Sequence, residues 1–294
     1  MRTPYFYILL LCLCCCSCIG EFEPVEPPKP SGSGTPQEDH PANQTAEIDL
    51  NHWKVTLPIG PPTEIHPPDI LDYTNIDVLK PYMFDDTSDQ SLVFYTEPGS
   101  TTTNSSYSRT ELREQMVPGS NTTNWTFAQG GQMKGTLRVS DISQLQNGDH
   151  HRVIVMQIHG RLTNEQRDLI GASDNNAPPV LKIYWHDGRI NVRRKVLKDV
   201  GLSATEKLYT DAWEDESFYF QKAVGFDPFT IEIKAEEGRL WVALNEGEEE
   251  FTFEDIHVQE WGIFENYFKA GNYLVSNTPG SHATVKYYDL MVSH

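Results

Sequence analysis

Three short polar stretches carry side chains that could act together on an acidic ligand. The first, residues 107–114, reads Y-S-R-T-E-L-R-E. Side chains alternate between the two faces of a strand, so Arg109, Glu111 and Arg113 are expected to share one face. A planar guanidinium binds a carboxylate through two hydrogen bonds, but opposite charges on a strand more often form a solvated, self-paired face. This stretch alone leaves both interpretations open.

The second stretch places an amide and an imidazole at the end of an apolar strand pattern. Gln157 and His159 follow the run V-I-V-M and, by alternation, share a face. A histidine can transfer protons near neutral pH, although a single histidine at a strand end is more often structural than catalytic.

The third stretch, residues 267–273, reads Y-F-K-A-G-N-Y. Alternation directs Tyr267, Lys269, Gly271 and Tyr273 to the same side, and a glycine there leaves room for close approach of another group. Tyrosine and lysine are also ordinary residues of strands. The three stretches can form one functional site only if the fold brings them together.

The elements that would position these stretches are strands separated by turn signals. An Asp187-Gly188 turn predicts one hairpin and a glycine at 238 predicts another. Helical periodicity is confined to 76–82 and 164–170. We therefore predict an all-β fold, an antiparallel β-sandwich jelly roll with a concave substrate cleft, in which residues 47–294 form one domain. The further predicted strands are 53–57, 91–96, 135–139, 152–159, 181–185, 189–196, 230–234, 239–244, 267–275 and 283–292.

The N-terminal region differs in composition from the rest. All five cysteines lie within residues 1–18, which also contain an apolar run from Tyr5 to Leu13. This pattern predicts a secretory signal whose Cys18 becomes a lipidated residue. Ordinary cleavage and free secretion is the alternative. Residues 19–46 are rich in Pro, Glu, Ser and Gly and predict a disordered linker. We expect an exported protein at the outer membrane or cell surface, or a secreted one, with the lipid anchor as its sole membrane contact.

The formal charge of −19 disfavours nucleic acid as a partner. An acidic polymer would need a local basic patch, and Arg193, Arg194 and Lys195 either extend such a patch or form a solvated hairpin. The ten histidines show no metal-ligand spacing. We expect a monomer without metal or cofactor.

Taken in order, R-T-E-L-R-E, Q-I-H and Y-F-K-A-G-N-Y resemble the motifs of the alginate lyases of polysaccharide lyase family 7. The resemblance extends from residues 50–58, through the hairpin at 184–189, to residues 285–290. One departure is visible: the family often continues the third motif with Asn-Gln, whereas Leu274 and Val275 stand here. This departure affects the details of substrate subsites.

The resemblance implies cleavage of a uronate polymer by β-elimination, without a cofactor. Donors must neutralise the uronate carboxylate before the proton on C5 can leave. A tyrosine titrates near 10, so its deprotonated form needs cationic neighbours such as Arg109, Arg113 and Lys269. The residues carried over as catalytic are Arg109, Gln157, His159 and Tyr273, with Tyr273 as base or acid and His159 as its partner or as the base for guluronate. The residues carried over as binding or supporting are Glu111, Arg113, Lys269 and Tyr267.

The alternatives are a lyase for another polyuronate, such as glucuronan, and a non-catalytic carbohydrate-binding jelly roll. A glycoside hydrolase would need paired carboxylates on a strand, and the sequence offers no E-x-D-x-x-E pattern. Within the resemblance, Ile158 of Q-I-H implies guluronate-containing or mixed alginate blocks. Residues 104–107 and 163–179 are the predicted lids of the cleft, and they leave endo and exo action undecided.

Overall fold

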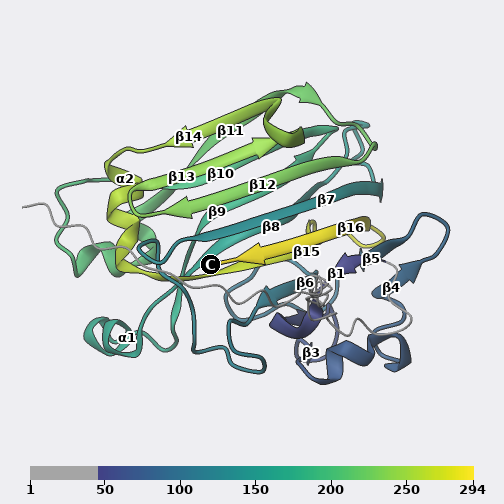
Figure 1. Cartoon of the computed structure of the whole chain (residues 1–294), viewed down its shortest axis with the longest axis horizontal. Coiled ribbons are helices and arrows are strands. Elements are labelled where there is room, and N and C mark those ends of the chain that lie inside the picture. Colours follow the sequence, from purple (N-terminus) through teal and green to yellow (C-terminus); the bar gives the residue numbers. More distant parts are fainter. Residues whose placement is uncertain (1–45) are drawn as a thin grey trace, which may run out of the picture. The chain divides into compact units, whose positions relative to one another are not determined.

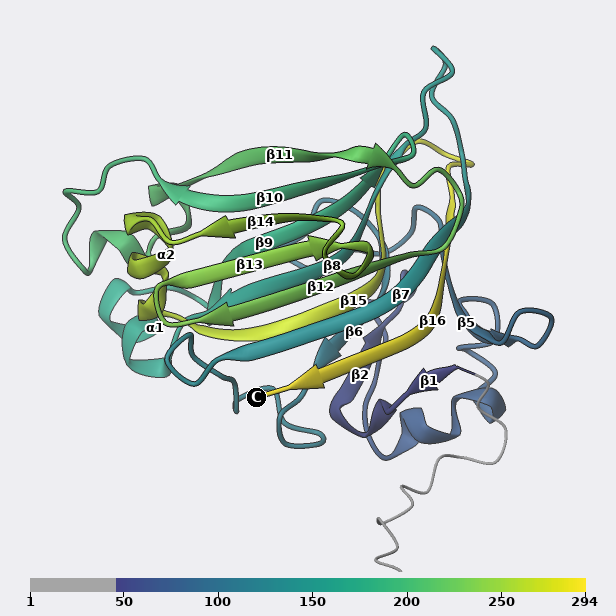
Figure 2. The same cartoon turned by 45° about the horizontal axis from the view of Figure 1, so that its top comes forward.

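Two packed β-sheets make up the part of the chain that the computed structural model describes, residues 46–294 (Figures 1 and 2). The first sheet contains, in spatial order, β14 (Glu249–Phe253), β13 (Arg239–Leu244), β12 (Phe229–Glu236), β7 (Gly131–Ile142), β16 (Ala283–Ser293), β5 (Ser91–Thr96) and β4 (Met83–Asp86), with β1 (Glu47–Ile48) beside β16. The second contains β11 (Trp213–Ala223), β10 (Arg189–Leu197), β9 (Asn176–His186), β8 (Arg152–Arg161), β15 (Glu265–Val275), β6 (Arg109–Glu114), β2 (Trp53–Thr56) and β3 (Glu64–Ile65).

Pairing is antiparallel throughout both sheets except between β1 and β16, which are parallel. The predicted all-β sandwich of the jelly-roll type is confirmed. Helical elements are short: α1 (Asn164–Ile170), α2 (Ile256–Glu260) and the 3₁₀ turns η1 (Leu50–His52), η2 (Asp69–Asn75), η3 (Glu206–Leu208), η4 (Thr210–Ala212), η5 (Asn245–Gly247) and η6 (Trp261–Ile263).

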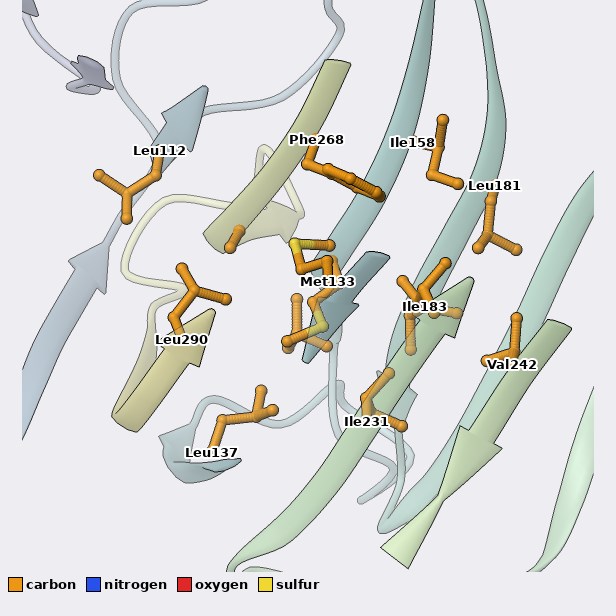
Figure 3. Close-up of a cluster of buried hydrophobic side chains, with 14 of the residues drawn as sticks. Leu112, Met133, Leu137, Ile158, Leu181, Ile183, Ile231, Val242, Phe268 and Leu290 are labelled. Carbon is orange, nitrogen blue, oxygen red and sulfur yellow. The ribbon is translucent and has the colours of Figure 1, made fainter. Parts of the chain in front are cut away.

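One hydrophobic core fills the space between the sheets (Figure 3). Leu112, Ile158 and Phe268 point into it from the second sheet, and Met133 and Ile231 meet them from the first. All are fully buried, and burial of each such side chain contributes about 1.5–3 kcal/mol. These positions alternate with the polar residues of the three motifs. The core therefore fixes the register that directs those polar residues to the opposite face of the second sheet.

Local signals explain several boundaries. The Asp187-Gly188 turn has positive φ at both residues, as a two-residue hairpin requires. Thr163 and Gln166 form a capping box at the start of α1, and Gly171 ends the helix in the left-handed conformation. The predicted helix at 164–170 is therefore confirmed.

The second predicted helix, at 76–82, is wrong. The helical segment there is η2, which ends at Asn75, and Ile76 is extended. Separate turns follow, with hydrogen bonds from the Leu79 amide to Ile76 and from the Tyr82 amide to Leu79. Pro81 explains the difference, because proline disfavours a helical residue before it and lacks an N–H to continue the helix.

The predicted signal sequence, Cys18 and nearly all of the predicted linker lie outside the described residues, and they stay predictions. No helix between residues 46 and 294 has the length and apolar character needed to cross a membrane.

Candidate active site

A cleft of about 420 Å³ lies over the face of the second sheet that points away from the core. Strands β2, β6, β8, β9 and β15 supply its floor. The structure thus brings together the three motifs that lie up to about 160 residues apart in the sequence. The predicted site residues that line the cleft are Arg109, Arg113, Gln157, His159, Tyr267, Lys269 and Tyr273.

Glu111 lies beneath these residues and connects them. Its carboxylate is 1 % exposed and accepts a hydrogen bond from Gln157 Nε2 at 2.5 Å. It also forms ion pairs with Arg109 Nη1, at 3.3 Å, and with Lys269 Nζ. The carboxylate thus holds one group from each of strands β6, β8 and β15. We had expected Glu111 to orient both Arg109 and Arg113. It contacts Arg109 but not Arg113, and it holds Gln157 and Lys269 in addition.

Arg113 is anchored mainly to the protein. Its guanidinium donates to Glu114 O at 2.6 Å, to Asn121 O at 3.0 Å and to Asn124 Oδ1 at 2.8 Å. It also lies 4.0 Å from the ring centroid of Tyr267. Burial raises the pKa of Tyr267, and the nearby arginines oppose that shift. Arg113 therefore stacks on Tyr267, whereas the sequence had suggested that it would act on Tyr273.

Tyr273 lies next to Arg109, whose guanidinium carbon is 4.2 Å from the tyrosine ring centroid. The ring of Tyr107, from one predicted lid, is 6.4 Å away on a tilted plane. Tyr273 pairs with Arg109 on β6 and with Ile154 on β8 in the strand register. It is thus positioned in the middle of the sheet, with a permanent cation over its ring.

His159 is held as a neutral imidazole. Burial, with the positive charges of Lys269 and Arg109, lowers its pKa to about 3. Its Nδ1 lies 2.9 Å from Gly160 O, and a carbonyl oxygen can only accept, so Nδ1 carries the proton and Nε2 keeps its lone pair. The ring stacks on Tyr267 with centroids 5.2 Å apart. This arrangement fixes both the tautomer and the orientation of the ring.

Lys269 is the most deeply buried cation of the cleft floor. Burial and the neighbouring charge of Arg109 lower its pKa to about 8, while Glu111 acts in the opposite direction. Lys269 is therefore largely protonated at neutral pH and loses its charge as the pH rises through about 8.

Gly271 leaves room for the close approach of another group, as predicted, and the structure identifies that group. Its φ is +134°, and a Cβ built there would lie 2.7 Å from the Thr110 carbonyl oxygen. The group that approaches closely is thus the backbone of strand β6. A bulge between β15 and β8 begins at Ala270, and the absence of a side chain at Gly271 lets β15 stay paired with β6 through it.

We expect Gly271→Ala to lower the free energy of unfolding by about 1–3 kcal/mol from backbone strain alone, with a further loss from the clash with Thr110. Urea denaturation of the domain measures this change. Gly280→Ala is the matched control, because Gly280 also has positive φ, +82°, but has open space around its Cβ position. Equal losses for the two variants would show that the close approach of β6 contributes nothing.

Several cleft residues lie outside the three motifs and were missed by the sequence analysis. Lys54, on β2, forms an ion pair with Glu64 at 2.6 Å, and burial lowers its pKa. The alternating pattern of residues 53–57 was the available signal, since it places Lys54 on the polar face. Arg152, Lys182 and Tyr184 also line the cleft.

The structure separates the three basic residues of β10. Arg193 lies over the Tyr184 ring at 4.8 Å, and Lys195 shares Asp215 with the cleft residue Lys182. Arg194 points the other way, is buried and pairs with Glu216 and Asp255. The prediction that Arg194 could extend the groove is therefore wrong. Strand alternation directs its side chain to the opposite face of the sheet from Arg193 and Lys195.

The two predicted lids contact each other beside the cleft. Asn104 Nδ2 donates to Asp174 Oδ2 at 2.8 Å, and both segments contribute lining residues such as Tyr107 and Pro179. Within residues 46–294, no group of three or more His, Cys, Asp or Glu side chains has the geometry to hold a metal ion.

Comparison with known proteins agrees with the fold and the motifs. The model of a family described as alginate lyase matches residues 48–294. Alginate lyase A1-II', a member of polysaccharide lyase family 7, is 31% identical with a TM-score of 0.67, and the match covers 84% of this chain and 96% of that one. No curated protein matches this chain.

Two further solved structures contain forms of the same enzyme with bound sugar. One holds a substrate designated GGMG, with 30% identity, a TM-score of 0.67, and coverage of 84% of this chain and 94% of that one. The other holds a product designated GGG, at 30% identity and a TM-score of 0.66, with 84% and 97% covered. An alginate lyase from Pseudomonas aeruginosa, 23% identical with a TM-score of 0.62 and 84% and 99% coverage, shares the fold.

A jelly roll with a cationic cleft across one sheet is suited to binding an acidic polysaccharide. The match over nearly the whole described chain makes the assignment specific. This chain belongs to the alginate lyases of polysaccharide lyase family 7, and it is a polysaccharide lyase that acts on alginate.

Proposed function

We propose that this enzyme cleaves alginate by β-elimination, with His159 and Tyr273 as the groups that move protons. The observation that carries the proposal is the neutral His159, which lies among three cationic side chains of the cleft. Its Nδ1 donates to Gly160 O, so its Nε2 is free to accept a proton. A substrate carboxylate bound there would offset those cations and raise the basicity of His159.

The reaction begins with neutralisation of the uronate carboxylate. Arg109 supplies a charge-assisted donor, and the Gln157 amide has a second N–H besides the one donated to Glu111. Stabilisation of the charge that develops on the carboxylate makes the C5 proton removable.

A base then takes the proton from C5, and the electron pair forms the C4–C5 double bond as the C4–O bond breaks. For guluronate we assign the base to His159 Nε2, and Tyr273 Oη donates its proton to the leaving oxygen. For mannuronate, with the opposite C5 configuration, Tyr273 can serve as both base and acid on one side of the ring. The product ends are a 4,5-unsaturated uronate and a new hydroxyl group.

We further propose guluronate-containing or mixed blocks as the preferred substrate. Ile158 between the two polar residues of Q-I-H supports this preference, because the family resemblance associates an isoleucine there with guluronate-containing blocks. Lyase action on another polyuronate, such as glucuronan, is the competing substrate assignment.

The test is the ultraviolet absorbance of the purified domain mixed separately with polyguluronate, a mixed-block alginate, polymannuronate and glucuronan. Elimination forms a conjugated unsaturated uronate, whereas hydrolysis does not, so absorbance rises only through the proposed chemistry. We expect the fastest rise with polyguluronate or a mixed-block alginate. Cleavage of alginate without a rise in absorbance would contradict β-elimination, and a faster rise with polymannuronate would contradict the block preference.

A further inference from the structure

Two β-bulges lie side by side in the second sheet, where β15 pairs with β8. On β15, Gly271 and Asn272 together face the single residue Val155 of β8. Val155 is in turn an extra residue relative to β9, because the register between β8 and β9 shifts between Ile154 and Met156. A bulge changes the direction of the side chains that follow it. The two bulges together therefore influence which groups of both strands reach the cleft.

The effect on β8 is a break in the alternation of side chains. Val155 and Met156 both belong to the hydrophobic core, although they are consecutive. As a result, Ile154 and Gln157 both line the cleft, three positions apart. On β15, Tyr273 is the first residue after the bulge to pair with β8 again. The position of the Tyr273 hydroxyl in the cleft therefore depends on the geometry of the bulges.

Tyr287 connects both bulges to the opposite sheet. It lies on β16, is fully buried, and extends its side chain across the core. Its hydroxyl donates to Val155 O at 2.5 Å and accepts a hydrogen bond from Gly271 N at 3.1 Å. Burial raises the pKa of Tyr287 well above its ordinary value, so the hydroxyl keeps its proton and stays a donor. One hydroxyl group thus joins the β8 bulge to the β15 bulge.

A second hydroxyl of the first sheet holds the other residue of the β15 bulge. Thr96, the last residue of β5, donates to Asn272 O at 3.1 Å and accepts from Thr110 N at 2.9 Å. The Asn272 side chain donates to Phe94 O and Ala283 O. Buried backbone groups outside a regular ladder need such partners. Both residues of the β15 bulge are therefore fixed from across the core.

We propose that Tyr287 is a positioning residue for the elimination reaction, and that it sets the place of the Tyr273 hydroxyl by holding the two bulges together. The proposal rests on the proposed function, in which Tyr273 gives a proton to the leaving oxygen. Tyr287 does not touch the substrate, because it lies on the core side of the second sheet. Without its hydroxyl, the bulge backbone at Gly271 and Val155 loses a shared partner, and Tyr273 moves with β15. A displacement of about 1 Å can lower a reaction rate by roughly a hundredfold.

The test is a double-mutant cycle on kcat, measured by ultraviolet absorbance at saturating alginate. Tyr287→Phe removes the hydroxyl alone, and we expect it to lower kcat about ten- to hundredfold while KM changes less than about threefold. In the Tyr273→Phe protein, whose proton donor is already absent, the same change should lower kcat less than about threefold. A purely structural role, or a partly unfolded variant, would cost the same factor in both backgrounds.

Tyr73→Phe is the matched control. Tyr73 is also fully buried, and its hydroxyl donates to Asp85 Oδ1 on β4 at 2.7 Å, away from the bulges. Its replacement should leave kcat within about twofold of the parent in both backgrounds. Circular dichroism verifies folding at the assay temperature. If Tyr287→Phe does not fold, Thr96→Val removes the second anchor with little change in size, and it should show the same dependence on Tyr273.

An unchanged kcat in Tyr287→Phe would overturn the positioning role, and so would an equal loss in the two backgrounds. Both results leave the proposed function intact, provided that the native enzyme raises the absorbance and Tyr273→Phe slows that rise. No rise with the native enzyme would overturn the proposed function itself. Native speed in Tyr273→Phe would remove Tyr273 as the acid. Either of these last two results also overturns the role of Tyr287.

Discussion

Tyr273→Phe is expected to reduce kcat on alginate by about 10²–10⁴-fold, the contribution typical of a general acid or base. Phenylalanine keeps the ring beneath the Arg109 guanidinium, 4.2 Å away, and removes the hydroxyl alone. The position of β15 should therefore be preserved, and KM should change far less than kcat. Initial rates from ultraviolet absorbance at saturating polymer, with circular dichroism to verify folding, measure the effect.

Tyr219→Phe provides the control for this experiment. Tyr219 lies on strand β11 of the same sheet, is exposed, and its hydroxyl interacts with His186 at 3.0 Å outside the cleft. Its replacement should leave kcat within about twofold of the native value. If Tyr273→Phe retained a similar rate, Tyr273 would not be the acid, and the proton would have to reach the leaving oxygen from another group.

Alternation in the sequence was sufficient to predict which residues of the central strands face the cleft. The pattern in residues 107–114 directs Arg109, Glu111 and Arg113 to one face, because the side chain of Leu112 between them is buried in the core. The same logic places Gln157 and His159 together. In β15, Lys269 and Tyr273 both face the cleft although the pairing with β8 is shifted by a bulge between Ala270 and Tyr273. Gly271 lies within this bulge, and its lack of a side chain lets β15 stay paired with β6.

The edge strands could not be predicted in this way. β11 and β14 were absent from the prediction, since each is at or next to the edge of its sheet and carries mostly polar residues. Only Trp213 and Phe220 are buried along β11. An edge strand is exposed on more sides, so its sequence has little hydrophobic alternation to detect.

The missing parts of the site depend on pairing between distant strands. Tyr184 reaches the cleft because β9 pairs with β8, and Arg193 reaches Tyr184 because β10 pairs with β9. Sequence spacing does not encode the order of strands in the sheet. The sequence therefore did not show whether Arg193 faces the cleft or the solvent, and it did not place Arg152 and Tyr184 in the cleft.

Glu111→Gln is expected to lower the free energy of unfolding at pH 7 by about 3–5 kcal/mol, the cost of leaving a buried charge without its partner. Gln157 can still bond to the new amide, but Arg109 and Lys269 lose the carboxylate between them. Activity should fall as well, because the same carboxylate orients groups from three strands. Urea denaturation and initial rates measure the two effects.

Glu216→Gln is the matched control, because Glu216 is a half-exposed partner of Arg194, which also pairs with Asp255. It should cost less than about 1 kcal/mol. A loss that small for Glu111→Gln would contradict the central role of that carboxylate.

The pH dependence distinguishes loss of charge at Glu111 from simple mispacking. The pKa of Lys269 is about 8 in the folded protein and 10.5 in its ordinary state. Between these values the unfolded chain binds more protons, so stability contributed by this group rises with pH. Removing the negative charge of Glu111 lowers the pKa of Lys269 in the folded protein further. The pH range in which the unfolded chain binds more protons than the folded one then begins at a lower pH. The destabilisation by Glu111→Gln should therefore be larger at pH 7 than at pH 9, where Lys269 is largely neutral in both folded proteins, whereas a packing defect would cost the same at both.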